Sequence, residues 1–196
     1  MNRLINTKNI NWVCHHLHID KSKTITSKLL DDSVKHMKAK WFIMRDIKNN
    51  YTENDLEERM LDTTKTLVAQ GCNKMRTFID VDNIVGLDAL HVANKVKKYW
   101  KNNDIELQIG TQLLEGLEQK QNIELFNEAS NYVDFIGCLP SRDNNPEKHL
   151  DIVFSKAQEL NLDIEAHLDQ LNVPIENETE MFCDFVEKYD YQGKSR

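Results

Sequence analysis

The stretch Asn11–Lys21, NWVCHHLHIDK, begins with a short apolar run and continues into two histidines that are separated by one residue. Side chains at positions i and i+2 of a strand point to the same face, so His16 and His18 can approach one metal ion together. An HxH pair alone fits a solvated strand end as well as a metal site. The stretch therefore predicts a first strand with two candidate ligands near its carboxyl end.

Beyond this stretch, patterns typical of strands and of helices alternate along the chain. Further strands are expected at residues 74–81, 105–111, 132–139 and 163–169. Apolar residues at helical spacing follow these strands, and also precede the second one, at residues 52–70, 87–99, 123–129, 150–160 and 181–189. Five strand-then-helix units in series predict a parallel sheet with crossover helices packed against it.

The first predicted helix has recognisable ends, whereas the segment before it does not form a clear pattern. Thr52 is a suitable N-cap residue and Gly71 a suitable residue just after the C-terminus of the helix. Residues 22–50 are basic and polar, with Trp41 and Phe42 as the main apolar anchors. They are expected to form a long connection with room for one short helix.

Length and composition restrict the class of protein. A chain of 196 residues with 40% hydrophobic residues can bury one sizeable core, so residues 1–196 are expected to form a single domain. Neither an apolar run of about 18 residues nor the apolar core of a secretory signal is present, so no membrane partner is expected. The net charge of −7 disfavours nucleic acid as a partner. Reduced, mostly buried thiols, which fit a cytoplasmic protein, are expected at Cys14, Cys72, Cys138 and Cys183.

Parallel α/β proteins place their functional residues at the carboxyl ends of the strands. His16 and His18 end the first predicted strand and His167 ends the fifth, so these three histidines are expected at the same rim of the sheet. Neutral imidazoles bind a borderline cation such as Zn²⁺ or Fe²⁺, and three of them leave a position open for water. Solvated or hydrogen-bonded side chains without a role in the site are expected for His15, His36, His91 and His149.

Three motifs together resemble the amidohydrolase superfamily in its cytosine deaminase branch. HHLHIDK at residues 15–21 is similar to the HxHLDK motif of the family's first strand. MRTFIDVD at residues 75–82 is similar to RTHVDV of the second strand, and IEAHLDQ at residues 164–170 to HxDE of the fifth. The resemblance covers nearly the whole chain. It implies an α/β fold that is a partial (β/α)₈ TIM barrel, with about five of the eight βα units.

The resemblance also implies a chemistry. It is that of a metal-dependent hydrolase that cleaves C–N bonds of small cyclic amines or amides, with metal-activated water as the nucleophile. His16, His18 and His167 would be ligands of one divalent metal ion, Zn or Fe. In the family a histidine of the sixth strand and an aspartate of the eighth complete the site.

The departures from the family pattern concern proton transfer and substrate binding. Gln170 stands where the family has the glutamate that carries a proton between water and the leaving amine, so this task is expected to be lost or moved to a neighbour such as Asp169. Leu114, beside Glu115, stands where cytosine deaminases present a glutamine to the pyrimidine ring, and Phe78 replaces the histidine of the second strand. Leu114 and Glu115 are the expected substrate-binding positions, and cytosine is not the expected substrate.

The sequence reaches Arg196 where the family's sixth strand would start, so the chain is expected to be truncated, with open strand edges that promote self-association. Three alternatives remain open. The first is a metal-dependent hydrolase of the cytosine deaminase type. The second is a catalytically inactive fragment, remnant or binding module that retains only the scaffold of such an enzyme, with at most a weak metal site. The third is an unrelated aldolase-like barrel with incidental histidines. Metal content separates the third from the others, and turnover of cyclic amines and amides separates the first two.

Overall fold

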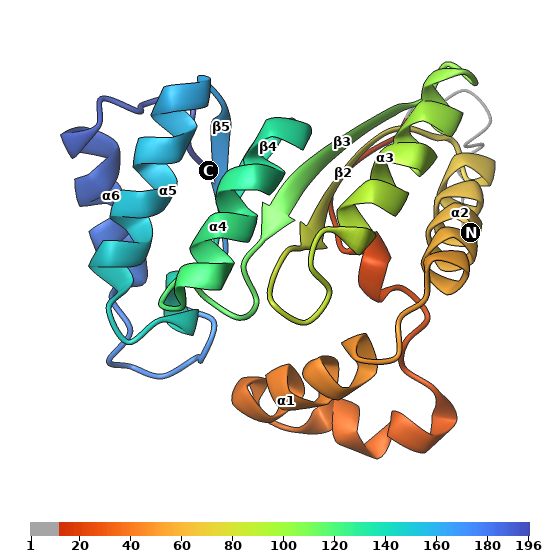
Figure 1. Ribbon diagram of the computed structural model, residues 1–196, viewed down its shortest axis with the longest axis horizontal. Helices are drawn as coiled ribbons and strands as arrows, with labels where there is room; N and C mark the ends of the chain where they lie inside the picture. Colours follow the sequence, from red (N-terminus) through yellow and green to blue (C-terminus); the bar gives the residue numbers. More distant parts are fainter. Residues whose placement is uncertain (1–11) are drawn as a thin grey trace, which may run out of the picture.

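The computed structural model describes residues 12–196, so Asn11 of the opening stretch and the residues before it lie outside the described part. Within residues 12–196, five strands form one sheet in the order β1-β2-β3-β4-β5, and every neighbouring pair is parallel. The strands are β1 (Trp12–Leu17), β2 (Cys72–Asp80), β3 (Glu106–Gln112), β4 (Phe135–Cys138) and β5 (Asp163–Ala166). They form a curled half-barrel with helices between the strands (Figure 1), which confirms the prediction of a partial TIM barrel.

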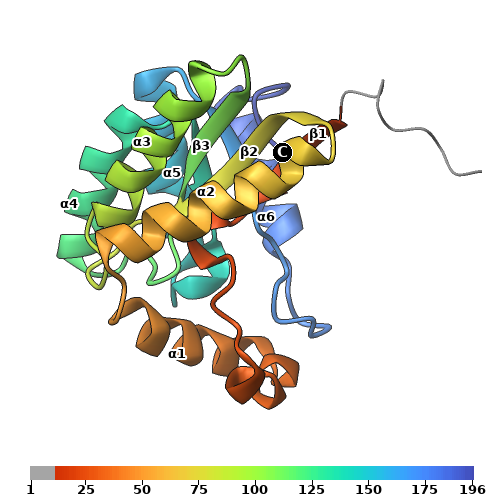
Figure 2. The ribbon, with the colours of Figure 1, turned by 90° about the vertical axis from the view of Figure 1, so that its right-hand side faces the viewer.

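Six α-helices of the described part accompany the sheet. They are α1 (Met37–Lys48), α2 (Glu53–Ala69), α3 (Asp88–Lys101), α4 (Lys120–Ala129), α5 (Pro146–Leu160) and α6 (Glu178–Lys188). Short 3-10 turns lie at Ile19–Lys21, Ser27–Leu29, Asp31–Val34, Ser130–Tyr132 and Pro140–Arg142. Helix α1 lies apart from the others, beyond the ends toward which the arrows of β2 and β3 point (Figures 1 and 2). It therefore covers the rim at which the functional residues are expected.

Alternate residues of each strand face opposite sides of the sheet. On β2 and β3 one set packs against α2 and α3 in an apolar cluster that includes Met75, Ile79, Leu107 and Ile109. A second cluster lies under α4, α5 and α6, and it includes Ile136, Leu150, Phe154, Ile164 and Phe182. The other set of strand residues faces the interior of the half-barrel. This division leaves the inner face free for polar and charged side chains.

The predicted ends of the first long helix are confirmed. The side chain of Thr52 accepts a hydrogen bond from the backbone N–H of Asp55 at 3.2 Å, which makes Thr52 the N-cap of α2. Gly71 has φ +95°, a conformation that a residue with a Cβ rarely adopts. It turns the chain from α2 directly into β2.

The segment 22–50 is a long connection, as expected, and its one α-helix is the twelve-residue α1. Trp41 is buried as predicted and packs with Leu114 and Leu139. The predicted second anchor is wrong, because the side chain of Phe42 is 69% exposed. Met37 lies four residues before Trp41, so both side chains are on the inner side of α1. Phe42, one residue further along the helix, points to solvent instead.

Two features bear on the predicted open edges and thiols. The outer edge of β5 is paired, because residues 194–196 run parallel to it and exchange backbone hydrogen bonds with Ile164 and Ala166. All four cysteines are free; Cys72 and Cys138 are buried, while Cys183 is exposed on α6.

Among residues 12–196, no helix combines the length and the apolar character that a membrane span requires.

Strand β4 passes so close to β3 at Gly137 that no side chain fits. A Cβ there would lie 1.7 Å from the carbonyl oxygen of Thr111 and 3.0 Å from Cδ1 of Phe78. Because the first contact is with backbone, Gly137→Ala is expected to lower the free energy of unfolding by about 3 kcal/mol. Gly86→Ala is the control, since its Cβ would meet nothing within 4 Å and only its positive φ costs about 1 kcal/mol. Equal losses in urea unfolding would contradict the close approach.

Candidate metal centre

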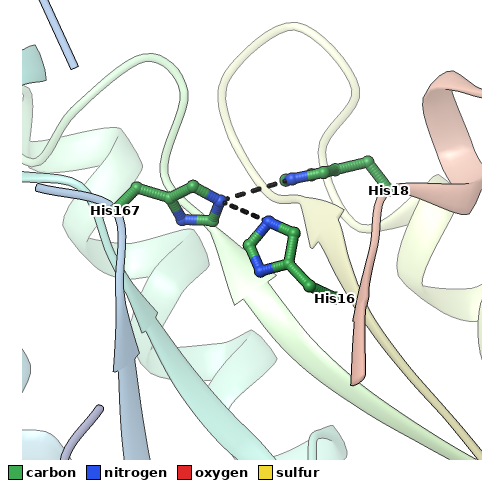
Figure 3. Close-up of side chains that lie close together, drawn as sticks. All are labelled: His16, His18 and His167. Carbon is green, nitrogen blue, oxygen red and sulfur yellow. Dashed lines mark hydrogen bonds between the residues drawn. The ribbon is translucent and has the colours of Figure 1, made fainter. Parts of the chain in front are cut away.

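Three histidines from opposite ends of the chain converge inside the half-barrel (Figure 3). His16 lies in β1, His18 just after it, and His167 just after β5. The Nε2 atom of His167 is 3.2 Å from Nε2 of His16 and 3.3 Å from Nε2 of His18. Two ligand nitrogens on a tetrahedral zinc ion, each at about 2.0–2.1 Å from it, are separated by about 3.3 Å. The arrangement of the three imidazoles therefore fits one ion.

The chemistry of the three rings also fits a metal ion. Burial and the positive charge of Lys21 lower the pKa of His18 to about 3. Burial, with the charges of His16 and Lys21, lowers the pKa of His167 to about 4. Both imidazoles are therefore neutral at pH 7, which is the form that binds a metal. Among the described residues, these three form the one group whose ligand atoms gather closely enough to hold an ion.

Phe78 of β2 forms an apolar floor beneath the histidines. Its ring centroid is 5.0 Å from that of His16, 5.3 Å from that of His18 and 4.5 Å from that of His167. The side chain is fully buried, so it excludes water from this side of the rings. A phenyl ring offers no ligand atom, and its contribution is to hold the three imidazoles in place by packing.

A carboxylate from β5 lies on the other side of His16. Oε1 of Glu165 is 3.4 Å from Nδ1 of His16, and Oε2 of Glu165 is 3.0 Å from the guanidinium of Arg76. Arg76 also donates to the side chain of Gln108 at 3.0 Å and lies over the ring of Phe135. Sequence reasoning missed Glu165. The available signal was its position two residues before His167, which in an extended chain places both side chains on the same, inner side.

A buried network of charges occupies the rim next to β1 and β2. Lys48, from the end of α1, forms ion pairs with Asp80 at 3.1 Å and with Asp82. Lys21 donates to Asp80 at 2.5 Å, and the carboxylate of Asp20 accepts a hydrogen bond from the backbone N–H of Asp80. Burial lowers the pKa of Lys48, but Asp80 and Asp82 outweigh it and keep this pKa above its usual value. Lys48 therefore remains charged and ties α1 to β2.

The two residues proposed for proton transfer follow β5. The carboxylate of Asp169 accepts a hydrogen bond from the backbone N–H of Glu178 at 3.0 Å and another from the hydroxyl of Thr179. It is therefore engaged in holding the N-terminal turn of α6. Gln170 is half-buried in the turn that follows, and its role stays a prediction.

The two predicted substrate-binding residues lie at the end of β3, close to α1. Leu114 is buried against Trp41, and its carbonyl oxygen accepts a hydrogen bond from Nε of Arg142. The carboxylate of Glu115 is 3.8 Å from the guanidinium of Arg45 on α1. Both residues thus lie beneath the covering helix, and their contact with a substrate stays a prediction.

Comparison with known proteins begins with sequence relatives, because no protein-family model matches the chain. An uncharacterized protein from Haemophilus influenzae is 30% identical over 188 residues, which cover 93% of this chain and 68% of that protein. N-isopropylammelide isopropyl amidohydrolase from a Pseudomonas species is 25% identical over 180 residues, which cover 82% of this chain and 41% of that enzyme.

Solved structures share the fold. 5-Methylcytosine deaminase from Klebsiella pneumoniae, solved with phosphonocytosine, has a TM-score of 0.86 at 23% identity, and the match covers 94% of this chain and 46% of that chain. N-isopropylammelide isopropylaminohydrolase from Burkholderia multivorans has a TM-score of 0.72 at 20% identity, covering 93% and 46%. The chain thus spans less than half the length of these structures. In its motifs and its half-barrel, the chain resembles these relatives, which are amidohydrolases and deaminases of the cytosine deaminase-like type.

Proposed function

We propose that this chain provides three metal ligands, His16, His18 and His167, to a hydrolase that cleaves a C–N bond of a small cyclic amine or amide. The observation that carries the proposal is the convergence of three Nε2 atoms, with neighbouring contacts of 3.2 and 3.3 Å. The names of the relatives support the substrate class, because both 5-methylcytosine and N-isopropylammelide are rings that carry an amine. A bound divalent ion, Zn²⁺ or Fe²⁺, would supply an activated water at neutral pH.

The residues of this chain contribute binding, orientation and the exclusion of water. His18 and His167 are kept neutral by burial, so they do not have to lose a proton before they bind the ion. Phe78 closes the site from below. Both apolar clusters pack against one sheet, and for this reason we propose that residues 1–196 form a single partial barrel domain.

A second candidate is a catalytically inactive relative that keeps the metal site. Gln170 favours it, because a carboxamide does not exchange a proton near neutral pH. The carboxylate of Asp169 accepts two hydrogen bonds from the first turn of α6, which also favours this candidate. Loss of a general acid or base costs about 10²–10⁴ in rate. The two candidates share the metal ion and differ in turnover.

Titration of the metal-free protein with Co²⁺ tests the metal site. We expect one ion per chain, with visible absorption bands of a low-symmetry site, because the Nε2 atoms of three imidazoles converge. His167→Asn should abolish stoichiometric binding, since it removes the ligand that β5 contributes. His91→Asn is the matched control, because His91 is exposed on α3 and should leave binding unchanged. Equal binding by His167→Asn and the unaltered protein would refute the site.

The metal-loaded protein then separates the two candidates. Release of isopropylamine from N-isopropylammelide, or of ammonia from 5-methylcytosine, supports the hydrolase. Stoichiometric metal binding without release of either amine supports the inactive relative.

A further inference from the structure

We propose that Glu165, held by Arg76, is a positioning residue for the metal centre. Its carboxylate accepts the Nδ1–H of His16 and so presents the Nε2 lone pair of that ring to the ion. The inference rests on the proposed metal site, and it concerns a residue outside the three ligands. It also assigns a task to the Arg76–Glu165 pair inside the half-barrel.

The first support is the environment of Glu165. Its side chain is only 12% exposed, and a carboxylate so far removed from water needs partners. Arg76 engages Oε2 at 3.0 Å and leaves Oε1 directed to Nδ1 of His16 at 3.4 Å. That distance is slightly longer than a hydrogen bond of about 2.7–3.2 Å, so a small rotation of the imidazole completes it.

The second support is the fixed position of Arg76. Its Nε donates to the side chain of Gln108 at 3.0 Å, and its guanidinium carbon lies 4.2 Å from the centre of the Phe135 ring. Contacts from β3 and β4 thus hold the guanidinium of a β2 residue. A guanidinium held in this way fixes the carboxylate that it binds, and the carboxylate can then orient a third group.

The third support is a difference among the three ligands. Nδ1 of His18 and Nδ1 of His167 are buried, and neither has a hydrogen-bond partner among the described residues. His16 is the one of the three whose second nitrogen faces a carboxylate. Partners of this kind fix the tautomer of a ligating histidine, and their removal costs about 10–100-fold in metal affinity. Glu165 therefore makes His16 the best prepared of the three ligands.

The pair also sets the distance between the ligands. Arg76 belongs to β2 and Glu165 to β5, and their ion pair crosses the interior of the curled sheet. His167 follows Glu165 by two residues, so the ion pair holds β5 and its ligand close to β2, and the neighbouring contact of Glu165 with His16 holds them close to β1. Orientation of His16 and placement of His167 both depend on one carboxylate.

Glu165→Gln is the decisive variant. Its carbonyl oxygen can still accept from Arg76, whereas its NH₂ group then faces His16 and donates to Nδ1. The preferred tautomer of His16 should change from Nδ1–H to Nε2–H, which blocks the nitrogen that faces the ion. Long-range ¹⁵N–¹H spectra of the metal-free protein report this tautomer, and competition with a chelator reports a loss of Co²⁺ or Zn²⁺ affinity of about 10–100-fold.

Glu106→Gln is the matched control, because Glu106 is a more exposed strand carboxylate, paired with Lys74. It should change neither the tautomer nor the affinity. If Glu165→Gln does not fold, Glu165→Asp replaces it. The charge that pairs with Arg76 remains, the carboxylate retreats from His16 by one methylene, and metal affinity should still fall.

Unchanged metal affinity in the folded variant would overturn the inference. So would a loss of affinity with an unchanged His16 tautomer, which would show a structural role alone. Absence of metal binding by the unaltered protein would refute the proposed function, whereas the tautomer measurement would still test Glu165.

Discussion

Lys48→Met is expected to lower the free energy of unfolding by about 3–5 kcal/mol, because it leaves buried carboxylates without their shared cation. The side chains of Lys48, Asp80 and Asp82 are almost completely inaccessible to solvent. Water cannot replace the lost partner, and a methionine of similar length fills the space without a charge. Urea unfolding of the metal-free protein measures the loss.

Two further variants sharpen this prediction. Lys95→Met removes an ion pair with Glu53 in which both side chains are more than half exposed, and it should leave the free energy of unfolding almost unchanged because solvent screens the pair. Asp82→Asn added to Lys48→Met should recover part of the stability, since a neutral amide no longer requires a counter-ion. Similar losses for Lys48→Met and Lys95→Met would show that the buried network is not a source of stability.

Phe78→Ala is expected to cost about 3–5 kcal/mol of stability and, in addition, to weaken metal binding. The stability is lost because a fully buried ring leaves a cavity. Metal affinity falls because the same ring contacts all three imidazoles, which gain rotational freedom when their floor is removed. Urea unfolding and Co²⁺ titration measure the two effects separately.

Phe154→Ala is the matched control for this variant. Phe154 is equally buried, but it packs with Phe182 and Tyr191 under the helices and not with the histidines. It should lose a similar amount of stability while it keeps the metal affinity of the unaltered protein. A parallel fall of metal affinity in both variants would mean that general loosening of the fold, and not the floor, affects the site.

The fold was predictable because apolar residues recur at a different spacing in its strands than in its helices. Alternation of strand-like and helical segments located all five strands and the helices that follow them, and Thr52 and Gly71 marked the ends of α2. The length of β5 was not predictable from its pattern. It ends at Ala166, and His167 keeps one backbone hydrogen bond, to the carbonyl of Cys138, as the chain turns into the following loop. The end of a strand depends on where the following segment turns away from the sheet, and the spacing of apolar residues within the strand does not indicate this.

The candidate site was predictable where it depends on strand geometry. Residues at i and i+2 share a face, and carboxyl ends of parallel strands share a rim, so the sequence alone was enough to group His16, His18 and His167. The same rule could have identified Glu165. Lys48 was beyond reach, because lysine is rarely buried and its partners at the end of β2, Asp80 and Asp82, are 32 and 34 residues away in the sequence.

The candidate metal ligands and the cover above them come from different parts of the chain. The candidate ligands belong to or directly follow strands of the sheet, whereas α1 belongs to a connection that meets the barrel through Lys48 at its end and Trp41 in its middle. Met37, Trp41 and Met44 pack with Leu114 and Leu139, so substitutions at these three positions are expected to alter the shape of the cover above β3 and β4 and to leave the strands in place. Changes confined to this single helix can therefore reshape the cover, while the three histidines and the strands that position them are inherited unchanged.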